Sequence, residues 1–434
     1  MENTNAASTA ELTVEKKFQL LLEISEKIST TLDLDMLLVH LIDTVKSIVD
    51  YDAAGIYVIK RQGELRLIEG MVTRGYEDEE SKRDLLLKLG EGVVGSVIER
   101  GSGVIIPDVI VEPRYVMARK ETRSELAVPI TLNERVIGAF NLESDTPNKF
   151  TEADAEVLHF FANAAAIAIE KAVLHEELVE KKRIESQLEV ARQVQASLLP
   201  DRPPEAPGFD VAAENLPTYE VGGDYYDFIV LPDGQIGVAI ADVSGKGVPA
   251  ALIMATFRAA LRTQVRNDFA IGQIIRKVNY LLWESTADSQ FVTAVYGVLD
   301  TTSGRFTYTN AGHNPPLLVG IDGSITELNR GGPALGVFDK ADYEEAVVDI
   351  EVGDVLVLYT DGVIEAADST GREFGVRRLQ QTVTVAKEMS AFKVTRAIMD
   401  ATRAFSGTEA FTDDFTLAVI KRTGDVTASP VEKV

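Results

Sequence analysis

Four aspartates in the second half of the chain stand beside apolar segments that have the length of β-strands. Asp242 follows the run Gly-Val-Ala-Ile-Ala, Asp361 follows Val-Leu-Val-Leu-Tyr-Thr, and Asp413 precedes a segment that begins at Phe415. Asp224 lies in Gly-Gly-Asp-Tyr-Tyr-Asp-Phe. Carboxylates gathered in one cleft repel each other strongly unless cations neutralise them. A single Asp-Gly pair is usually only a turn, but four such sites together predict an all-oxygen metal centre.

The available ligands decide which metal this centre prefers. The chain has no Cys and only four His residues, whereas it has 68 Asp and Glu residues. Oxygen ligands favour Mg²⁺ or Mn²⁺ over Zn²⁺. Without Cys there is also no thiolate nucleophile and no disulfide framework. The sequence therefore favours chemistry in which metal ions activate water.

Length and composition predict two folded domains and restrict the partners. The chain has 434 residues, of which 45% are hydrophobic and 26% charged, as in folded globular proteins. No apolar run looks long enough to cross a bilayer, and the N-terminus lacks the pattern of a secretion signal. The net charge of −25 disfavours nucleic acid and anionic membranes as partners. These features together predict a cytoplasmic protein.

The first half of the chain reads as an α+β domain of about 160 residues. An amphipathic helix is expected after Asp33, and Thr151 and Asp154 form a capping pair that opens a later helix. Between them, short apolar segments are separated by glycines and charged turns. The predicted strands are residues 53–59, 65–72, 104–106, 125–131 and 136–142.

A charged helix without Gly or Pro is predicted from Glu170 to about Leu198, and Pro200 ends it. Steps of four and three, typical of a coiled-coil seam, occur at Ile184, Leu188, Ala191, Gln195 and Leu198. Extended toward the N-terminus, this seam reaches Lys181 and Glu177 and becomes polar. Two interpretations remain open: a parallel dimer stalk that carries a signal, or a solvated single-helix spacer.

The second domain is strand-rich and contains two adjacent predicted helices. The helices are expected at residues 249–266 and 271–284. The predicted strands include residues 291–299, 306–310, 316–319, 355–359 and 415–420. Five motifs follow one another between about residues 197 and 422. They are Glu220-Val-Gly-Gly-Asp-Tyr-Tyr-Asp-Phe228, Asp242-Val-Ser-Gly-Lys-Gly-Val-Pro-Ala-Ala-Leu252, Asn310-Ala-Gly-His-Asn-Pro-Pro316, Tyr359-Thr-Asp-Gly-Val-Ile-Glu-Ala366 and Asp413-Asp-Phe-Thr416.

These five motifs resemble those of the metal-dependent PPM phosphatases, in particular the bacterial SpoIIE-like branch that regulates sigma-factor partner switching. The resemblance implies an αββα sandwich with two Mn²⁺ or Mg²⁺ ions between its sheets. Asp242 would bridge both ions, and the carbonyl of Val243 would bind one of them. Asp361 and Asp413 would complete the shell of the second ion. Asp224 would act at the first ion, through a water.

Three neighbours of these ligands are expected just outside the metal shell. Asp414 stands where relatives often have Asn, which makes Asp413 the expected ligand of that pair. Ser244 stands where wider-family members have a His proposed to protonate the leaving group. A water on the metal must therefore serve instead, or turnover will be modest. Lys246 is expected either to contact phosphate or to be a solvated loop lysine.

The chemistry that the resemblance implies needs no protein nucleophile. Two cations about 3.5–4 Å apart lower the pKa of a shared water and neutralise the phosphoryl oxygens. The hydroxide would attack phosphorus in line and displace the Ser or Thr alkoxide, without a phosphoenzyme. Arg258, Arg262 and Arg266 lie at helical spacing after the Gly-Lys-Gly loop. They form either a solvated face or a docking stripe for an acidic phosphoprotein. His313 is expected to hold a turn rather than a metal.

Motifs in the first domain resemble a GAF domain over about residues 15–172. They are Gly90-Glu-Gly-Val-Val-Gly-Ser-Val97, Val104-Ile-Ile-Pro-Asp108, Ser124-Glu-Leu-Ala-Val-Pro-Ile130 and Val136-Ile-Gly-Ala-Phe-Asn-Leu-Glu143. In that family a six-stranded sheet backs a pocket for a small ligand, or the domain simply dimerises. No Cys is present to attach a bilin, and His40 and His159 lie on helices expected outside the pocket, so haem is unsupported. A ligand sensor and a ligand-free dimerisation module both remain open.

The sequence thus predicts a protein serine/threonine phosphatase fused to a GAF sensor. Its expected substrate is a phosphorylated STAS-type anti-sigma-factor antagonist, and a small molecule or protein signal at the GAF domain and a homodimer are also expected. A catalytically inactive scaffold that acts by binding is the alternative, and a two-metal nuclease conflicts with the acidic surface. The predicted segments are a flexible start (1–14), the GAF domain (15–172), the coiled-coil linker helix (173–199), the phosphatase domain (200–424) and a tail (425–434).

Overall fold

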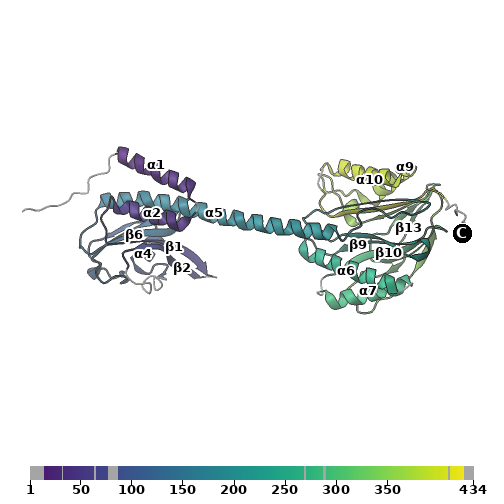
Figure 1. Cartoon of the computed structure of the whole chain (residues 1–434), viewed down its shortest axis with the longest axis horizontal. Coiled ribbons are helices and arrows are strands. Elements are labelled where there is room, and N and C mark those ends of the chain that lie inside the picture. Colours follow the sequence, from purple (N-terminus) through teal and green to yellow (C-terminus); the bar gives the residue numbers. More distant parts are fainter. Residues whose placement is uncertain are drawn as a thin grey trace, which may run out of the picture. The chain divides into compact units, whose positions relative to one another are not determined.

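The computed structural model describes residues 14–31, 33–62, 65–76, 87–267, 270–286, 290–408 and 411–424. The predicted flexible start, up to residue 13, and the predicted tail lie outside the described residues. The chain divides into two compact units, Met1–Arg183 and Ile184–Val434 (Figure 1). Each unit has its own sheets and its own apolar cores.

The N-terminal unit is built on a six-stranded antiparallel sheet in the order β3-β2-β1-β6-β5-β4. The strands are β1 (Ala53–Gln62), β2 (Leu65–Arg74), β3 (Leu87–Lys88), β4 (Val104–Ile106), β5 (Ser124–Leu132) and β6 (Arg135–Ser144). The helices are α1 (Val14–Thr30), α2 (Leu34–Lys46), α4 (Gly92–Arg100) and α5 (Glu152–Ala196), with a 3₁₀ turn at Val109–Val111. The predicted six-stranded GAF sheet is confirmed.

Strand alternation divides the core of this unit into two layers. Leu126 and Val128 point to the face covered by α2 and α5, whereas Ala127 points to the face covered by α4. The cap predicted at the start of α5 is confirmed, because the Thr151 N–H donates to Asp154 Oδ2 at 2.8 Å. Helix α4 was not predicted, because its nine residues are too short to show a helical period.

Helix α5 corrects the expectation that no segment could cross a membrane. Among the described residues this one 45-residue helix is long and apolar enough in one 18-residue window, by length and composition. Its buried residues, which include Leu158, Phe161 and Ala165, pack in the core of the N-terminal unit. The apolar window therefore contains the packing face of a core helix.

The C-terminal unit is an αββα sandwich, as predicted. One sheet has the order β14-β11-β10-β9-β8, with β15 paired to β11, and the other has the order β13-β12-β16-β17-β7. The strands are β7 (Phe209–Leu216), β8 (Tyr225–Val230), β9 (Gln235–Val243), β10 (Val292–Asp300), β11 (Arg305–Ala311), β12 (Leu317–Val319), β13 (Ile325–Glu327), β14 (Gly331–Gly332), β15 (Ala346–Asp349), β16 (Val355–Tyr359) and β17 (Phe415–Arg422).

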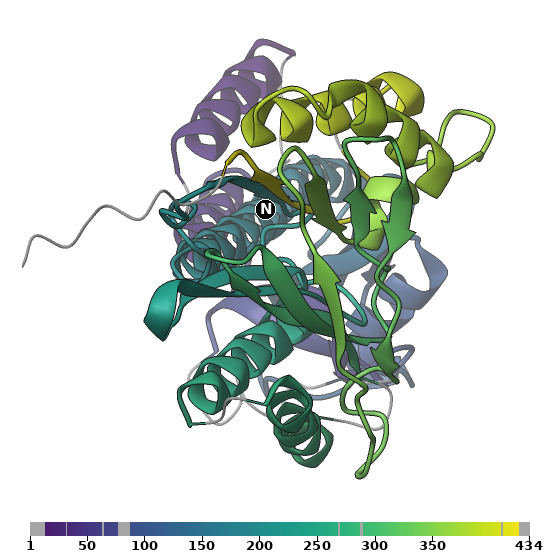
Figure 2. The ribbon, with the colours of Figure 1, turned by 90° about the vertical axis from the view of Figure 1, so that its right-hand side faces the viewer.

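Helices cover both outer faces of this sandwich (Figure 2). Helices α6 (Val248–Asn267) and α7 (Ile271–Ser285) pack on the first sheet, while α8 (Asp361–Ile364), α9 (Gly375–Ala386) and α10 (Ala391–Ser406) pack on the second. A third apolar cluster, with Ile240, Phe306 and Leu358, fills the space between the sheets. The sandwich places the ends of β8, β9, β16 and β17 near one another, where the predicted carboxylates lie.

Candidate metal centre and active site

Asp224 is the most deeply buried carboxylate of the predicted centre. It directly precedes β8 and is 3% exposed. Its Oδ2 accepts hydrogen bonds from Thr360 Oγ1 at 2.7 Å and from Thr416 Oγ1 at 2.5 Å. These two hydroxyls come from the opposite sheet, next to Asp361 and Asp413. Sequence reasoning missed both threonines, although each stands inside a quoted motif.

Asp242 and Val243 are the last two residues of β9, the strand that pairs with β8. Asp242 shares a hydrogen bond with Asp224. Gly223 packs against the Val243 carbonyl, because a Cβ at residue 223 would lie 3.1 Å from that oxygen. A Cβ at Gly222 would lie 2.5 Å from Asp414 Oδ2. The Gly-Gly pair therefore lets the Asp224 segment approach both neighbouring segments.

Asp361 and Asp413 come from the second sheet. Asp361 is the first residue of α8, directly after β16 and Thr360, and Asp413 lies two residues before β17. Lys246 Nζ lies 2.7 Å from Asp413 Oδ2, with both side chains partly exposed. Lys246 is therefore paired with a predicted metal ligand, and its contact with phosphate stays a prediction.

Asp414 and Ser244 hold loops in place. Asp414 Oδ1 accepts the N–H of Thr218 and Oδ2 accepts that of Gly223, both at 2.8 Å. Ser244 Oγ accepts the Phe291 N–H at 2.9 Å, and its own N–H donates to the Phe291 carbonyl. Both side chains therefore fix the backbone around the carboxylates.

The carboxylates raise one another's pKa. Burial and the charge of Asp242 raise the pKa of Asp224 well above its usual range. Burial and the charges of Asp361 and Asp413 raise the pKa of Asp242 to about 7. Burial and Asp413 also raise the pKa of Asp361. These mutual effects indicate that Asp224, Asp242, Asp361 and Asp413 lie near one another at one end of the sandwich.

The donor set fits hard divalent cations by its chemistry, but its side chains are not arranged as a ligand shell. In the described part of the chain, no group of three or more His, Asp or Glu side chains is gathered to hold an ion. Asp224 accepts hydrogen bonds from two threonines, and Asp413 forms an ion pair with Lys246. Carboxylate and carbonyl oxygens are the ligands that Mg²⁺ and Mn²⁺ prefer. Divalent cations would also remove the repulsion that raises these pKa values.

His313 is buried beside the centre, with both ring nitrogens engaged by protein groups. Its Nδ1 lies 2.8 Å from Thr293 Oγ1, and its Nε2 lies 3.1 Å from the Tyr359 carbonyl. Burial lowers the pKa of His313 to about 4. The side chain of Asn310 bonds to the backbone of His313 on both sides. These contacts give His313 the turn-holding arrangement that the sequence favoured.

Two of the three arginines predicted as a docking stripe on α6 bind groups within the C-terminal unit. Arg262 donates to both oxygens of Asp227, at 2.7 and 2.8 Å, and Asp227 is fully buried. Tyr225 donates to the same carboxylate. Arg258 Nε donates to the Leu198 carbonyl at 2.6 Å. Only Arg266 lies on the exposed face, so the sequence interpretation is wrong for the other two, whose distant partners helical spacing does not show.

Gln195, near the end of α5, contacts the segment that carries Asp224. Its Nε2 donates to the Gly222 carbonyl at 2.7 Å, and its Oε1 accepts the Gly222 N–H at 3.0 Å. Sequence reasoning placed Gln195 and Leu198 in a coiled-coil seam. In the structure, Gln195 binds within the C-terminal unit, and Leu198 packs against the core that lies under α6 and α7.

The fold and its carboxylates define a phosphatase-like αββα sandwich behind a GAF domain, and comparisons with known proteins agree. Residues 232–423 match the family model "Stage II sporulation protein E (SpoIIE)", and residues 31–170 match a GAF domain model. Phosphoserine phosphatase RsbU of Bacillus subtilis is 32% identical over 244 residues, which are 56% of this chain and 72% of RsbU. Phosphoserine phosphatase RsbP of the same species is 25% identical, over 44% of this chain and 48% of RsbP.

A solved structure supports the fold. The SiaA-PP2C domain of Pseudomonas aeruginosa has a TM-score of 0.50 and 23% identity, and the match covers 56% of this chain and 98% of that domain. This chain belongs to the SpoIIE-type branch of the PPM phosphatases and carries a GAF domain in front of the phosphatase domain. It is thus a phosphoprotein phosphatase of a metal-dependent family.

Proposed function

We propose that this chain dephosphorylates phosphoserine or phosphothreonine on a STAS-type anti-sigma-factor antagonist, under control of its GAF domain. The observation that carries the proposal is the convergence of Asp224, Asp242, Asp361 and Asp413 from the strand ends of both sheets. RsbU and RsbP, the two relatives above, are named phosphoserine phosphatases. The SpoIIE-like motifs support a substrate in a sigma-factor partner-switching pathway.

Two Mn²⁺ or Mg²⁺ ions would be held by Asp242, the Val243 carbonyl, Asp361 and Asp413, with Asp224 acting through a water. When bound, such ions supply charge neutralisation at the phosphoryl group and activation of water. Thr360 and Thr416 orient Asp224 through its Oδ2. Ligation through Oδ2 of Asp413 would compete with Lys246 for that oxygen. The released ammonium would then be available to a phosphoryl oxygen of the substrate.

A phosphate-release assay tests this function with the full chain. The substrate is a STAS-type protein phosphorylated on serine, with and without Mn²⁺. We expect release only with the metal, and none from Asp242→Asn, while the control Asp339→Asn, at an exposed position, keeps wild-type activity. Metal-independent binding of the phosphoprotein without release would instead establish the scaffold alternative.

We further propose that the GAF signal enters the phosphatase domain through the end of α5. Gln195 bonds to both backbone groups of Gly222, two residues before Asp224. Arg258 bonds to Leu198 and belongs to α6, which begins after the Asp242 loop. A rotation of the helix end would move the segments that carry these two aspartates. Of these two contacts, the one between Arg258 and Leu198 lies on the predicted path from the linker to residues 249–284.

The linker is also the proposed dimer contact. Leu174, Leu178 and Ile184 on α5 are each about half exposed, at 57%, 50% and 47%. Burial of such side chains against a second α5 would remove apolar surface from water. Light scattering on the full chain should give a dimer and the Leu174→Glu/Leu178→Glu variant a monomer. A monomeric full chain would refute the stalk.

We retain the remaining sequence predictions as part of this proposal. The domains are the GAF domain (15–172), the linker (173–199) and the phosphatase domain (200–424), in a cytoplasmic protein that needs neither nucleic acid nor membrane. The acidic composition and the lack of Cys support that location.

A further inference from the structure

Large apolar side chains lie exposed on three segments that border the carboxylates of the C-terminal unit. We call these side chains the apolar rim: Tyr219, 51% exposed, Val248, 45%, Leu252, 66%, and Phe291, 39%. Single exposed apolar residues are common on protein surfaces, whereas a group of them at one site marks a place where another molecule binds. The rim therefore calls for a partner if its four members belong to one site.

The loop that carries Tyr219 is fixed beside the metal centre. Asp414 accepts one backbone N–H from each end of this loop, both at 2.8 Å. A Cβ at Gly223 would lie 3.3 Å from the Cβ of Ala250, so the loop packs against the start of α6. Tyr219 also interacts electrostatically with Lys246, the residue paired with a predicted metal ligand. Tyr219 is thus held between the start of α6 and the carboxylates.

Two members of the rim stand on the first turns of α6. Val248 is the first residue of this helix, and Leu252 follows four residues later on the same face. The loop before them is open: among the described atoms, none lies within 4 Å of a Cβ built at Gly245 or Gly247. A molecule that reaches the metal centre over this loop therefore meets Val248 and Leu252 beside it.

Phe291 borders the same loop. Its backbone N–H donates to Ser244 Oγ at 2.9 Å, and its carbonyl accepts the Ser244 N–H at 3.0 Å. Phe291 directly precedes β10, whose Thr293 is the register partner of Asp242 on β9. The rim residues therefore come from segments far apart in the sequence and border one site.

The substrate itself is the molecule that must lie on this rim. A phosphoseryl side chain is short, so its phosphorus reaches the carboxylates only if neighbouring residues of the substrate lie on the segments around them. Lys246 stands two residues before Val248, and its partly exposed ammonium group suits the phosphoryl group. Arg258 and Arg262, which would attract acidic neighbours, bind within the C-terminal unit. Apart from the phosphoryl group, the surface of the substrate that fits here is therefore apolar.

We propose that the apolar rim binds large apolar residues that flank the phosphoserine of the substrate protein, and so selects phosphoserine in an apolar context. This inference rests on the proposed phosphatase function and names the residues that determine its specificity. Apolar contacts suit this position, because they add no charge to a centre that already gathers carboxylates. Tyrosine and large apolar side chains in such contacts release water from apolar surface when the substrate binds.

Two phosphoserine peptides of equal length and charge test this specificity with the full chain and Mn²⁺. One peptide has leucines at the positions on both sides of the phosphoserine, and the other has serines there. p-Nitrophenyl phosphate, which has no flanking residues, reports the chemistry alone. Measured by phosphate release, kcat/KM for the leucine peptide should exceed that for the serine peptide about tenfold, mainly through a lower KM.

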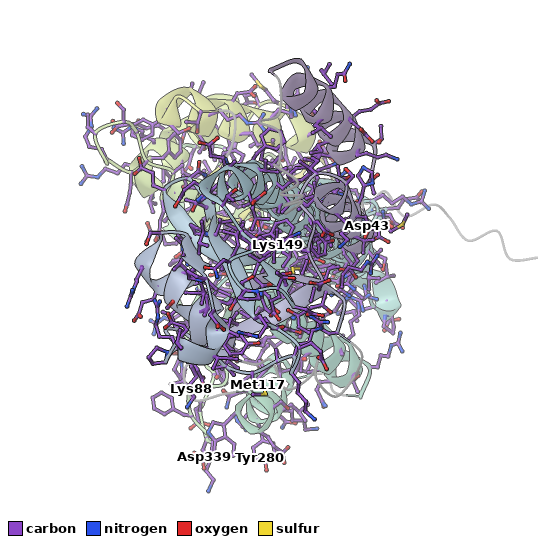
Figure 3. All side chains as sticks on the ribbon, turned by 90° about the vertical axis from the view of Figure 1, so that its left-hand side faces the viewer. Asp43, Lys88, Met117, Lys149, Tyr280 and Asp339 are labelled. Carbon is purple, nitrogen blue, oxygen red and sulfur yellow. The ribbon has the colours of Figure 1, made fainter. Side chains whose placement is uncertain are left out.

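Variants connect this preference to the rim. Leu252→Ser and Tyr219→Ser should each lower kcat/KM for the leucine peptide about tenfold and leave kcat for p-nitrophenyl phosphate within about twofold. Tyr280→Ser is the matched control, because Tyr280 is 49% exposed on α7. It borders a cavity that Asp339 also lines, and both residues lie at the surface (Figure 3). This control should keep the wild-type values for all three substrates.

Several results would overturn the proposal. Equal kcat/KM for the two peptides in the wild type would show that the rim selects nothing. Equal losses on the leucine peptide and on p-nitrophenyl phosphate would mean that the rim supports the metal centre instead of the substrate. If light scattering showed that the rim variants lose a dimer but keep the peptide preference, a second copy of the chain would cover the rim. Release from none of the three substrates would refute the phosphatase function itself.

Discussion

The C-terminal unit gathers carboxylates from separate strand ends, whereas the N-terminal unit pairs two glutamates within neighbouring strands. Asp242 and Asp361 lie where β9 ends and α8 begins, so their side chains border loops that can adjust. Glu125 and Glu143 are fixed by the register of β5 and β6. The first arrangement can rearrange around divalent cations. The second has a fixed spacing that suits a proton or a single positive charge.

A third carboxylate shows how this chain buries a negative charge permanently. The Asp227 carboxylate accepts hydrogen bonds from Nε and Nη2 of Arg262 and from the hydroxyl of Tyr225. The only lysine at the phosphatase carboxylates among the described contacts is Lys246, which is 45% exposed and pairs with Asp413. Arg262 thus neutralises Asp227 from within the chain. The phosphatase carboxylates lack such an arginine in the described contacts, so part of their charge is left for a bound cation.

The largest effect on activity is expected at the carboxylates of the C-terminal unit, where we predict divalent metal ions. Asp242→Asn should reduce phosphate release by more than the 10–100-fold that follows the loss of an outer-shell partner. Without metal, the same variant should melt at a higher temperature than the wild type, because it removes one charge from a mutually repelling group. Phosphate release and calorimetric melting check the two expectations.

Asp414→Asn is the matched variant for that test. An Asn oxygen can still accept one of the two N–H groups that Asp414 receives from Thr218 and Gly223. It should therefore keep most of the activity. Equal losses in Asp242→Asn and Asp414→Asn would contradict the assignment of Asp414 to the loop rather than to the metal.

Loss of the Arg262–Asp227 pair should lower the stability of the C-terminal unit rather than act directly on the reaction. Arg262→Ala leaves the buried Asp227 without its partner, and breaking a buried pair in this way costs about 3 kcal/mol. Trp283 is the only Trp of the chain and lies on α7, so its fluorescence during urea unfolding reports the C-terminal unit. Arg266→Ala is the control, because Arg266 lies on the exposed face of α6, the helix that also carries Arg262. It should change the unfolding midpoint little. A midpoint unchanged in Arg262→Ala would show that Asp227 needs no counter-ion.

Local patterns predicted several of the elements and the phosphatase carboxylates, but not helices α4, α9 and α10 or the partners of the carboxylates. Strands β4 and β16 have the predicted bounds, and Asp242 and Asp361 lie at the strand ends where the sequence placed them. Arg262 was misread because its partner Asp227 is 35 residues away on a strand, which helical spacing cannot show. Glu125 was missed, although a charge inside an apolar strand segment was a visible signal.

The glutamate pair predicts a pH dependence of the N-terminal unit. Folded Glu125 keeps its proton up to about pH 8, whereas an unfolded Glu releases it near pH 4.5. The folded state therefore binds more protons between these values, and stability falls as pH rises, by up to ~1.4 kcal/mol per pH unit. Hydrogen exchange of β5 and β6 peptides, corrected for intrinsic rates, measures this slope. Glu125→Gln should flatten it, and an equally steep slope in that variant would assign the titration to another group.

The smallest effect is expected where the two regions would communicate. Gln195→Ala removes both hydrogen bonds to Gly222 without touching a carboxylate. We expect about a tenfold loss of phosphate release, as for an outer-shell partner, because the Asp224 segment loses its hold on α5. Gln193→Ala is the control, since Gln193 is exposed and its side chain bonds to Glu189 within the same helix. If both variants keep wild-type activity, the end of α5 does not set the position of Asp224, and the route from the GAF domain must run through α6 and Arg258.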